Sequence, residues 1–256
     1  AIEKLPGGIT QYRPRTEGLF ARIYRHLDAT NDYWKVMTKD GLTSWYATPG
    51  KKDQDDAVVA DPDDSNKVFQ WKLTKTQDPF GNVIIYTYAK ENLTDTYHRW
   101  EQSYLSNIQY MDYGNKANPK FLMKVVLEYE ERPDPFSEYK MGFETRINKR
   151  CKSIKTYVQH NPSTQQPIHT RTYHFQYLDE MVAASELPLN GVSLLSRVEV
   201  EGHDGTESEK LPPLDFRYTQ YQPGKQKFTP LKGKGTPTLS LGTPTYEMAS
   251  LFGNGL

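Results

Sequence analysis

Two-residue alternation of apolar and polar side chains is the feature that most limits what this chain can fold into. It is clear at 19–24 and at 34–46, whereas no long window places apolar residues at the helical spacing of i, i+3, i+4 and i+7. Within 34–46, Asp40-Gly41 separates two alternating stretches, which is typical of a hairpin with a type I′ turn and positive φ at both residues. The chain is therefore predicted to be all-β and antiparallel.

The alternating stretches also recur as a weak repeat of two motifs. The first motif occurs at Leu105-x-x-Ile108, Cys151-x-x-Ile154 and Leu195-x-x-Val198, and the second at Val125-x-Leu127-x-Tyr129, Tyr173-x-Phe175-x-Tyr177 and Leu214-x-Phe216-x-Tyr218. Such a period indicates an array of hairpins, in which each hairpin buries its apolar face only with the help of its neighbours. Asp78-Pro79-Phe80-Gly81-Asn82 predicts a further turn between strands at 68–73 and 83–88.

Composition narrows the class of protein. Lys and Arg number 32 and Asp and Glu number 32, so the net charge of zero argues against a nucleic-acid binder and against attraction to anionic lipid. Mean hydropathy is low, at −0.79, but 18 Tyr, 10 Phe and 4 Trp supply apolar bulk for a folded protein. No apolar run is long enough to cross a bilayer, so membrane insertion is not expected.

The segment 51–67 is acidic and short of apolar residues. Asp61, Asp63 and Ser65 alternate as calcium ligands can, but the glycine and the distal glutamate of an EF-hand loop are missing. A solvated loop is therefore favoured over a calcium site. From residue 221 onward Pro and Gly become frequent, which is typical of a connector.

Few residues suggest chemistry. Glu128-Tyr129-Glu130 places two carboxylates on one face of a strand, as in arginine-directed ADP-ribosyltransferases, but these enzymes also need an upstream Arg and a Ser-Thr-Ser strand, and the nearest match to that strand, Ser163-Thr164-Gln165, lies downstream in a polar loop. We expect instead a solvent-facing strand edge with Arg132 and Lys124 as partners. The six histidines are scattered, and Cys151 is the one cysteine and is interpreted as a small buried hydrophobe. No catalytic, cofactor-binding or metal-binding residues are predicted, and no cofactor.

A longer set of phrases resembles a known family. They are Tyr12–Ile23, Asp32–Val36, Phe69–Leu73, Asp78–Tyr86, Glu130–Asp134, Tyr139–Arg146, Gly202–Gly205 and Leu211–Thr219. Taken together they resemble the SpvB-type region of the B component (TcB, TcdB-like) of bacterial insecticidal toxin complexes. Asp78-x-x-Gly81-Asn82 followed by Tyr86 and Tyr88 is also similar to the YD repeats of Rhs proteins. Gly253-Asn254-Gly255-Leu256 resembles the opening of that family's propeller segment, so the chain is expected to be part of a longer protein.

The resemblance implies a structural role. Residues 1–220 would be an array of hairpins forming part of a β-sheet shell, and 221–256 a Pro/Gly-rich connector leading toward a truncated β-propeller. The implied partners are other segments of the same B component, a TcC-like C component with its enclosed toxin, and a TcA-like pore-forming component. The resemblance further implies a secreted, extracellular, non-enzymatic protein that delivers a cytotoxic protein.

Two other functions stay open on the sequence. The first is a secreted or surface module that binds glycans or proteins, with glycans recognised through Trp34, Trp45, Trp71 and Trp100. The second is an ADP-ribosyltransferase that uses Glu128 and Glu130.

In the shell interpretation the low hydropathy has a simple cause, because a sheet with a lumen on one side and solvent on the other has little deep core.

Overall fold

The computed structural model describes residues 1–16, 18, 20–159, 166–219, 223–225, 227 and 233–234. The chain divides into two compact units, Ala1–Thr219 and Gln220–Leu256. In the second unit one short 3-10 turn, η2 (Pro223–Lys225), is described, so most of the predicted connector 221–256 lies outside the described residues. No helix of the described part is long and apolar enough to span a membrane.

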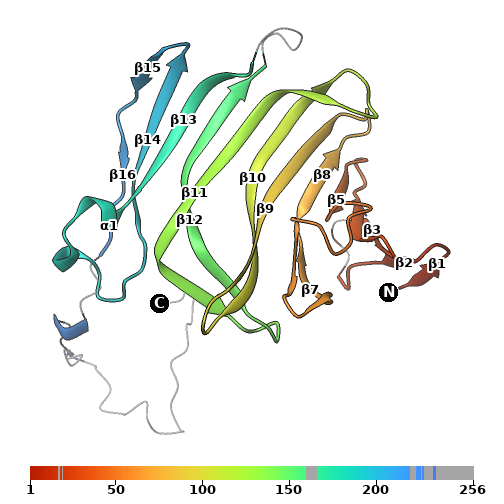
Figure 1. The fold of residues 1–256 in the computed structure, drawn as a ribbon, viewed down its shortest axis with the longest axis horizontal. Coiled ribbons are helices and arrows are strands. Elements are labelled where there is room, and N and C mark those ends of the chain that lie inside the picture. Colours follow the sequence, from red (N-terminus) through yellow and green to blue (C-terminus); the bar gives the residue numbers. More distant parts are fainter. Residues whose placement is uncertain are drawn as a thin grey trace, which may run out of the picture. The chain divides into compact units, whose positions relative to one another are not determined.

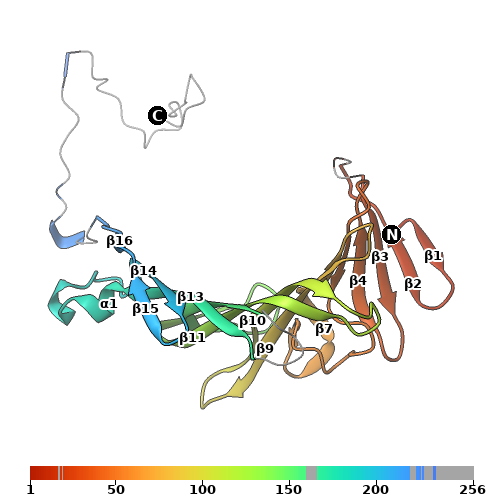
Figure 2. The same ribbon diagram turned by 90° about the horizontal axis from the view of Figure 1, so that it is seen from above.

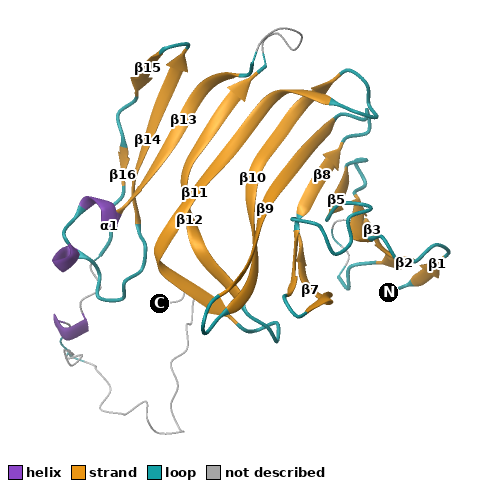
Figure 3. Cartoon of the chain, in the orientation of Figure 1, coloured by secondary structure: helices purple, strands orange, loops and turns teal. Residues whose placement is uncertain are grey.

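The first unit is built almost entirely from strands (Figure 3). The strands are β1 (Glu3–Leu5), β2 (Ile9–Tyr12), β3 (Arg22–Leu27), β4 (Asp32–Met37), β5 (Thr43–Tyr46), β6 (Val58–Asp61), β7 (Asp64–Trp71), β8 (Leu73–Gln77), β9 (Val83–Thr94), β10 (Arg99–Tyr113), β11 (Lys120–Glu138), β12 (Thr145–Val158), β13 (Ile168–Tyr177), β14 (Leu195–Asp204), β15 (Glu207–Lys210) and β16 (Leu214–Asp215). Two short helical elements, α1 (Leu178–Met181) and η1 (Ala184–Glu186), follow β13.

Within the described residues, fourteen of these strands form one antiparallel sheet in the order β1-β2-β3-β4-β5-β8-β9-β10-β11-β12-β13-β14-β15, with β16 also paired to β14 (Figure 1). The single parallel pairing joins Glu101 of β10 to Thr145 of β12. Strands β6 and β7 form a separate two-stranded sheet. The prediction of an all-β antiparallel fold is confirmed, and the repeated motifs lie on consecutive strands side by side in this sheet. No propeller is found in the described part of the chain.

The hairpin turns differ in type from the prediction. At Asp40-Gly41 only Gly41 has positive φ, +86°, and its amide donates to the Thr38 carbonyl at 3.0 Å. The connection is therefore a type I turn closed by a left-handed glycine, and not the expected type I′ turn. The turn at Asp78–Asn82 repeats this geometry, with Gly81 at φ +87°. A Cβ on Gly41 would come within 2.7 Å of Pro79, so the two turns pack together.

The sheet is a single layer, as its edge-on view in Figure 2 shows. Strands β10 to β14 carry mainly half-buried side chains, which neighbours within the sheet shield laterally. Cross-strand neighbours share a face, as Lys35 of β4, Trp45 of β5 and Lys75 of β8 do. The predicted strand at 68–73 is divided at Lys72, because Val68–Trp71 belong to β7 and Leu73 begins β8.

The acidic segment 51–67 is not the solvated loop that its composition predicts. It contains β6 and the start of β7, and Val59 of β6 is 1% exposed. Ala57 and Ala60 are buried beside it, and Asp55 is buried because it accepts hydrogen bonds from the amides of Thr48 and Ala57. A short apolar run inside an acidic stretch thus forms a local core. We call the segment that contains this core, residues 48–72, the insert. Asp61 and Asp63 bind Lys67 and Arg99, and they hold no calcium-type cluster.

The first motif marks a β-bulge at each of its three occurrences, and a fourth bulge of the same kind begins at Leu73. At each bulge one strand has an extra, unpaired residue between two paired residues, whose partners on the preceding strand are consecutive. The paired residues are Leu73/Lys75 opposite Tyr46/Trp45, Leu105/Asn107 opposite Tyr88/Thr87, Cys151/Ser153 opposite Tyr129/Glu128, and Leu195/Arg197 opposite Tyr177/Gln176. Pairing with the following strand stops at the same points, at Lys75, Asn107, Ser153 and Arg197. Neighbouring strands therefore diverge past each bulge, and we call these four places forks.

At each fork a tyrosine hydroxyl bridges the two diverging chain segments with a hydrogen bond. The hydroxyls of Tyr88, Tyr129, Tyr177 and Tyr218 donate to the carbonyls of Leu73, Leu105, Cys151 and Leu195 at 2.8, 2.9, 2.7 and 2.6 Å, and we call these bonds the tyrosine clasps. A bulge disrupts the ladder, so the carbonyl before it needs another donor. Burial raises the pKa of Tyr88, Tyr129 and Tyr177 to about 12, which keeps these hydroxyls protonated.

Replacing Tyr129 by Phe is expected to lower the free energy of unfolding by about 1–2 kcal/mol, because the Leu105 carbonyl loses its donor while the ring stays. Urea denaturation followed by circular dichroism measures the change. Tyr97→Phe is the matched control, since Tyr97 is 87% exposed and its hydroxyl makes no hydrogen bond. Equal stabilities for the two variants would show that the clasp contributes nothing.

Candidate functional site

The carboxylates of Glu128 and Glu130 lie on β11, and each is bound by a cation of β12. Glu128 accepts from Lys155 at 2.6 Å and from Ser153 at 2.7 Å, and Glu130 binds Arg150 at 2.8 Å. The Lys155 ammonium lowers the pKa of Glu128. The expected partners Arg132 and Lys124 are therefore wrong, and β11 is not an edge strand: Arg150 stands directly opposite Glu130 on β12, and Lys155 reaches Glu128 diagonally from the place opposite Val126. Both carboxylates are held in structural ion pairs.

The buried guanidinium of Arg150 fastens α1 to the sheet. It binds Asp179 at 2.7 and 3.0 Å and Glu180 at 2.6 Å, and it stacks over the Tyr177 ring at 4.0 Å. Burial and the neighbouring Glu130 raise the pKa of Glu180. The pairs join positions about thirty residues apart, so the sequence pattern gave no sign of them. The cluster is an anchor for the segment after β13.

A second anchor holds the same segment at Asp134 of β11. Its carboxylate accepts from Arg132 at 2.9 and 3.0 Å and from both the amide and the hydroxyl of Ser193. Burial alone would raise the pKa of Asp134, but the Arg132 guanidinium and the Ser193 donors outweigh it and hold this pKa well below its usual range. The ionised form of Asp134 is thus part of the folded structure.

Histidines that are far apart in the sequence meet on β13 and β14. The rings of His169 and His203 stack with centroids 3.9 Å apart, and the Thr172 hydroxyl lies 2.9 and 3.0 Å from their Nε2 atoms. Burial and the neighbouring His203 lower the pKa of His169, which favours the neutral ring. Among the residues described, no group of three or more His, Cys, Asp or Glu is placed to hold a metal ion. His160 lies outside the described residues.

Three of the four tryptophans of the glycan hypothesis face inward. Trp100 is 6% exposed, and Arg25 lies over the rings of Trp34 and Trp71 at 5.6 and 5.1 Å. The indole N–H groups of these three tryptophans are buried without a partner. Trp45 is different, because its side chain lines an open cleft. Among the four tryptophans, Trp45 is therefore the one whose ring lines a cleft of ligand size.

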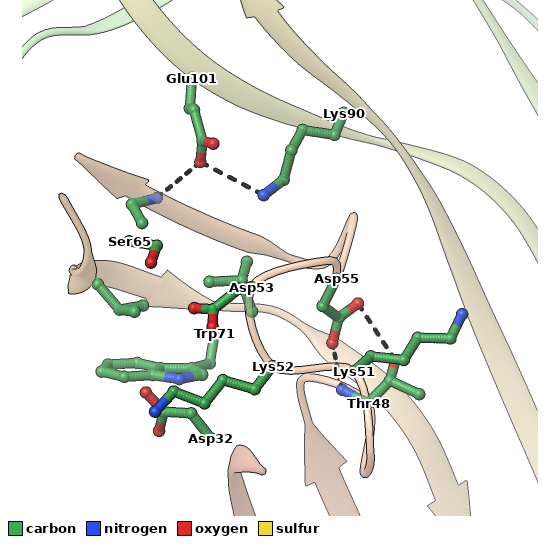
Figure 4. A pocket seen from close by; sticks show the side chains of 13 residues that line it. Asp32, Thr48, Lys51, Lys52, Asp53, Asp55, Ser65, Trp71, Lys90 and Glu101 are labelled. Atoms are coloured by element: carbon green, nitrogen blue, oxygen red, sulfur yellow. Dashed lines mark hydrogen bonds and ion pairs between the residues drawn. The ribbon is translucent and has the colours of Figure 1, made fainter. Parts of the chain in front are cut away.

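A small cavity lies between the insert and β10 (Figure 4). Glu101, buried above it, accepts from the Ala60 amide at 2.9 Å, from Lys90 at 3.3 Å and from Asn92 at 3.4 Å. The cavity measures about 40 Å³, which is room for a few water molecules and too little for an organic ligand. These contacts dock the insert on the sheet.

The comparison with known families now has a structural context. Over residues 7–111 and 98–160 the sequence matches the family described as the Salmonella virulence plasmid 65kDa B protein, SpvB. The chain belongs to the SpvB family. The resemblance inferred from the sequence phrases is thereby confirmed.

Curated members of the SpvB family share part of the chain. The mono(ADP-ribosyl)transferase SpvB of Salmonella typhimurium strain 14028s is 26% identical over 188 residues, and the same identity is found with SpvB of Salmonella enteritidis. The match covers 57% of this chain and 30% of the relative. The chain thus corresponds to less than a third of the length of these SpvB proteins.

Solved structures share the fold. The N-terminal domain of the effector protein SpvB from Salmonella typhimurium strain LT2 superposes with a TM-score of 0.64 at 20% identity, covering 77% of this chain and 69% of that domain. The crystal structure of TcdB2-TccC3-TEV superposes with a TM-score of 0.66 at 22% identity, covering 84% of this chain and 12% of the other. A TcdB2-TccC3-Cdc42 structure gives 0.65 at 21% identity. The sheet is thus common to SpvB and TcdB2.

The anchor at Asp134 makes acid stability testable. The depressed pKa of Asp134 contributes stability above about pH 4, the ordinary range of aspartate, and this contribution is lost as the pH falls below it. Asp134→Asn removes this pH-dependent contribution, so the stability of the variant is expected to fall less between about pH 6 and pH 2.5 than that of the unmodified chain. Urea midpoints at both pH values measure the difference. Asp56→Asn, whose side chain makes no hydrogen bond or ion pair, should behave as the unmodified chain; if Asp134→Asn does so too, the anchor is not ionic.

Proposed function

We propose that this chain is a non-enzymatic part of the B component of a toxin complex. It forms a section of the wall of a hollow β-sheet shell, which encloses a cytotoxic protein for delivery through a pore-forming A component. The observation that carries the proposal is the single-layer sheet, which superposes on TcdB2 in TcdB2-TccC3 structures over 84% of the chain. A layer of this kind needs further chain or a partner against its faces, because outside the docked insert its half-buried faces are not packed against a second layer in the described part.

The partners follow from the same comparison. We infer that a C component related to TccC3 completes the shell and supplies the enclosed toxin, and that a pore-forming component receives it. Residues 1–220 would be the wall, and 221–256 a connector toward a propeller. Bacterial toxin and effector relatives support a secreted protein. The sequence that follows Leu256 in the parent gene tests the connector, since blades rich in Asp and Gly are expected there.

Labelling of residues on the two faces of β11 tests whether the assembled shell encloses a lumen. Lys124 and Val125 are neighbours on this strand and point to opposite faces. In a Cys151→Ala background, Lys124→Cys and Val125→Cys are each treated with a maleimide carrying a polyethylene glycol chain. Both cysteines should react in the isolated chain, and only one in the parent B component assembled with its C component, because the other faces a closed lumen. Equal labelling of both in the assembly would contradict the shell.

The ADP-ribosyltransferase alternative is disfavoured by the ion pairs of Glu128 and Glu130 and by the fold match to the N-terminal domain of SpvB. We infer that the transferase activity in the name of the SpvB relatives belongs to a region that this chain does not match. The chain is therefore expected to hydrolyse NAD at the buffer rate, and Glu130→Gln should leave this rate unchanged. An assay of nicotinamide release measures it. Turnover that Glu130→Gln abolishes would restore the enzyme hypothesis.

A further inference from the structure

The fork between β8 and β9 contains an open cleft. Pairing of the two strands ends at Lys75 and Ile85, although β9 continues to Thr94 (Figure 1). The fork between β10 and β11 is filled differently, by the rings of Tyr104 and Tyr129, which lie tilted against each other with their centroids 5.2 Å apart. The cleft measures about 370 Å³, within the range of small-ligand sites. It is therefore large enough for one or two sugar rings.

One wall of the cleft is the indole of Trp45 on β5. The ammonium of Lys75 lies 4.8 Å from the ring centroid, and that of Lys35 lies 5.5 Å from it. These three residues are direct cross-strand neighbours on one face of the sheet, so the lysines flank the indole. The arrangement sets two positive charges beside one flat apolar surface.

The cleft also collects polar residues that have no hydrogen-bond or ion-pair partner among the described residues, although the Lys75 ammonium contacts the Trp45 ring. Lys51, Asp56, Lys75, Tyr86 and Thr87 are among the residues that line it, and none of their side chains makes a hydrogen bond or ion pair with another described residue. Asp55 and Tyr88 line it as well, but their polar atoms bind Thr48, Ala57 and Leu73. In this family member most other charged side chains of the sheet are paired, as at Glu128, Glu130 and Glu101. Free donors and acceptors around an aromatic wall are the pattern of a binding site.

The mixture of groups selects the class of ligand. An apolar ring face fits Trp45, hydroxyl groups fit Asp56 and Thr87, and a carboxylate fits the lysines. A pyranose ring that bears a carboxylate combines all three. We propose that the cleft between β8 and β9 binds an acidic carbohydrate, with a uronate ring against Trp45 and its carboxylate toward Lys75 and Lys51. This site is separate from the proposed wall function and does not depend on it.

The test uses the four indole N–H signals of the 256-residue chain in a ¹H–¹⁵N NMR spectrum, assigned by single Trp→Phe substitutions. A galacturonic acid trimer is expected to shift the Trp45 signal saturably and to leave those of Trp34, Trp71 and Trp100 in place. A neutral galactose trimer should bind at least about tenfold more weakly, because it lacks the carboxylate that the lysines attract. Lys75→Gln should weaken binding of the uronate trimer by about fivefold or more.

Lys124→Gln is the matched control, since Lys124 lies on the same face of the sheet, outside the cleft, and makes no ion pair. It should bind the trimer as the unmodified chain does. Hexaglutamate separates the alternatives: a shift of Trp45 equal to that with the trimer would mean a site for acidic peptides and would overturn the carbohydrate proposal. No saturable shift with the uronate, or equal affinity of Lys75→Gln, would also overturn it. Because none of these outcomes depends on shell assembly, the shell proposal can fail while the cleft proposal stands.

Discussion

The structure depends on how a very wide antiparallel sheet satisfies its backbone where its strands diverge. Each bulge interrupts the ladder on one side, while pairing with the next strand ends on the other, so one carbonyl at each fork needs a donor from elsewhere. The tyrosine clasps supply it from the following strand. A phenol suits the place, because its ring covers the apolar gap of the fork while its hydroxyl reaches the backbone beyond. This accounts for four of the 18 tyrosines, namely Tyr88, Tyr129, Tyr177 and Tyr218.

A single layer has consequences for stability and for its edges. Side chains shielded mainly by lateral neighbours cannot form a deep core, and Val59, the largest fully buried aliphatic side chain among the described residues, belongs to β6 of the insert and not to the fourteen-stranded sheet. One end of the sheet closes with β15, whose residues Glu207–Lys210 are all exposed and mostly charged, before Pro212-Pro213. Charged side chains and proline disfavour pairing of this edge with a strand of another chain. The other end, β1, is only three residues long, so it offers little edge.

The sequence predicted the strands and their repeat because period-two alternation acts locally. It also contained the clasps without revealing them: Tyr129 and Leu105 both stand in the repeated motifs, but only the bulge and the divergence bring them together. The insert was misjudged for a similar reason, since the burial of Asp55 depends on amides of Thr48 and Ala57 that composition cannot show. Ion pairs such as Arg150 with Asp179 join distant positions, which a single sequence does not reveal.

The distribution of satisfied polar groups separates the structural residues from a binding surface. The carboxylates that could have suggested catalysis are bound by cations, and the stacked histidines share one threonine hydroxyl. Groups neutralised in this way stabilise the sheet and are poorly available for reaction. Around Trp45 the opposite holds, because two lysines, an aspartate, a threonine and a tyrosine at a fork whose strands stand apart make no hydrogen bond or ion pair through their side chains. Charges without an ion-pair partner contribute little to sheet stability, so their concentration around this cleft is better explained by a ligand than by folding.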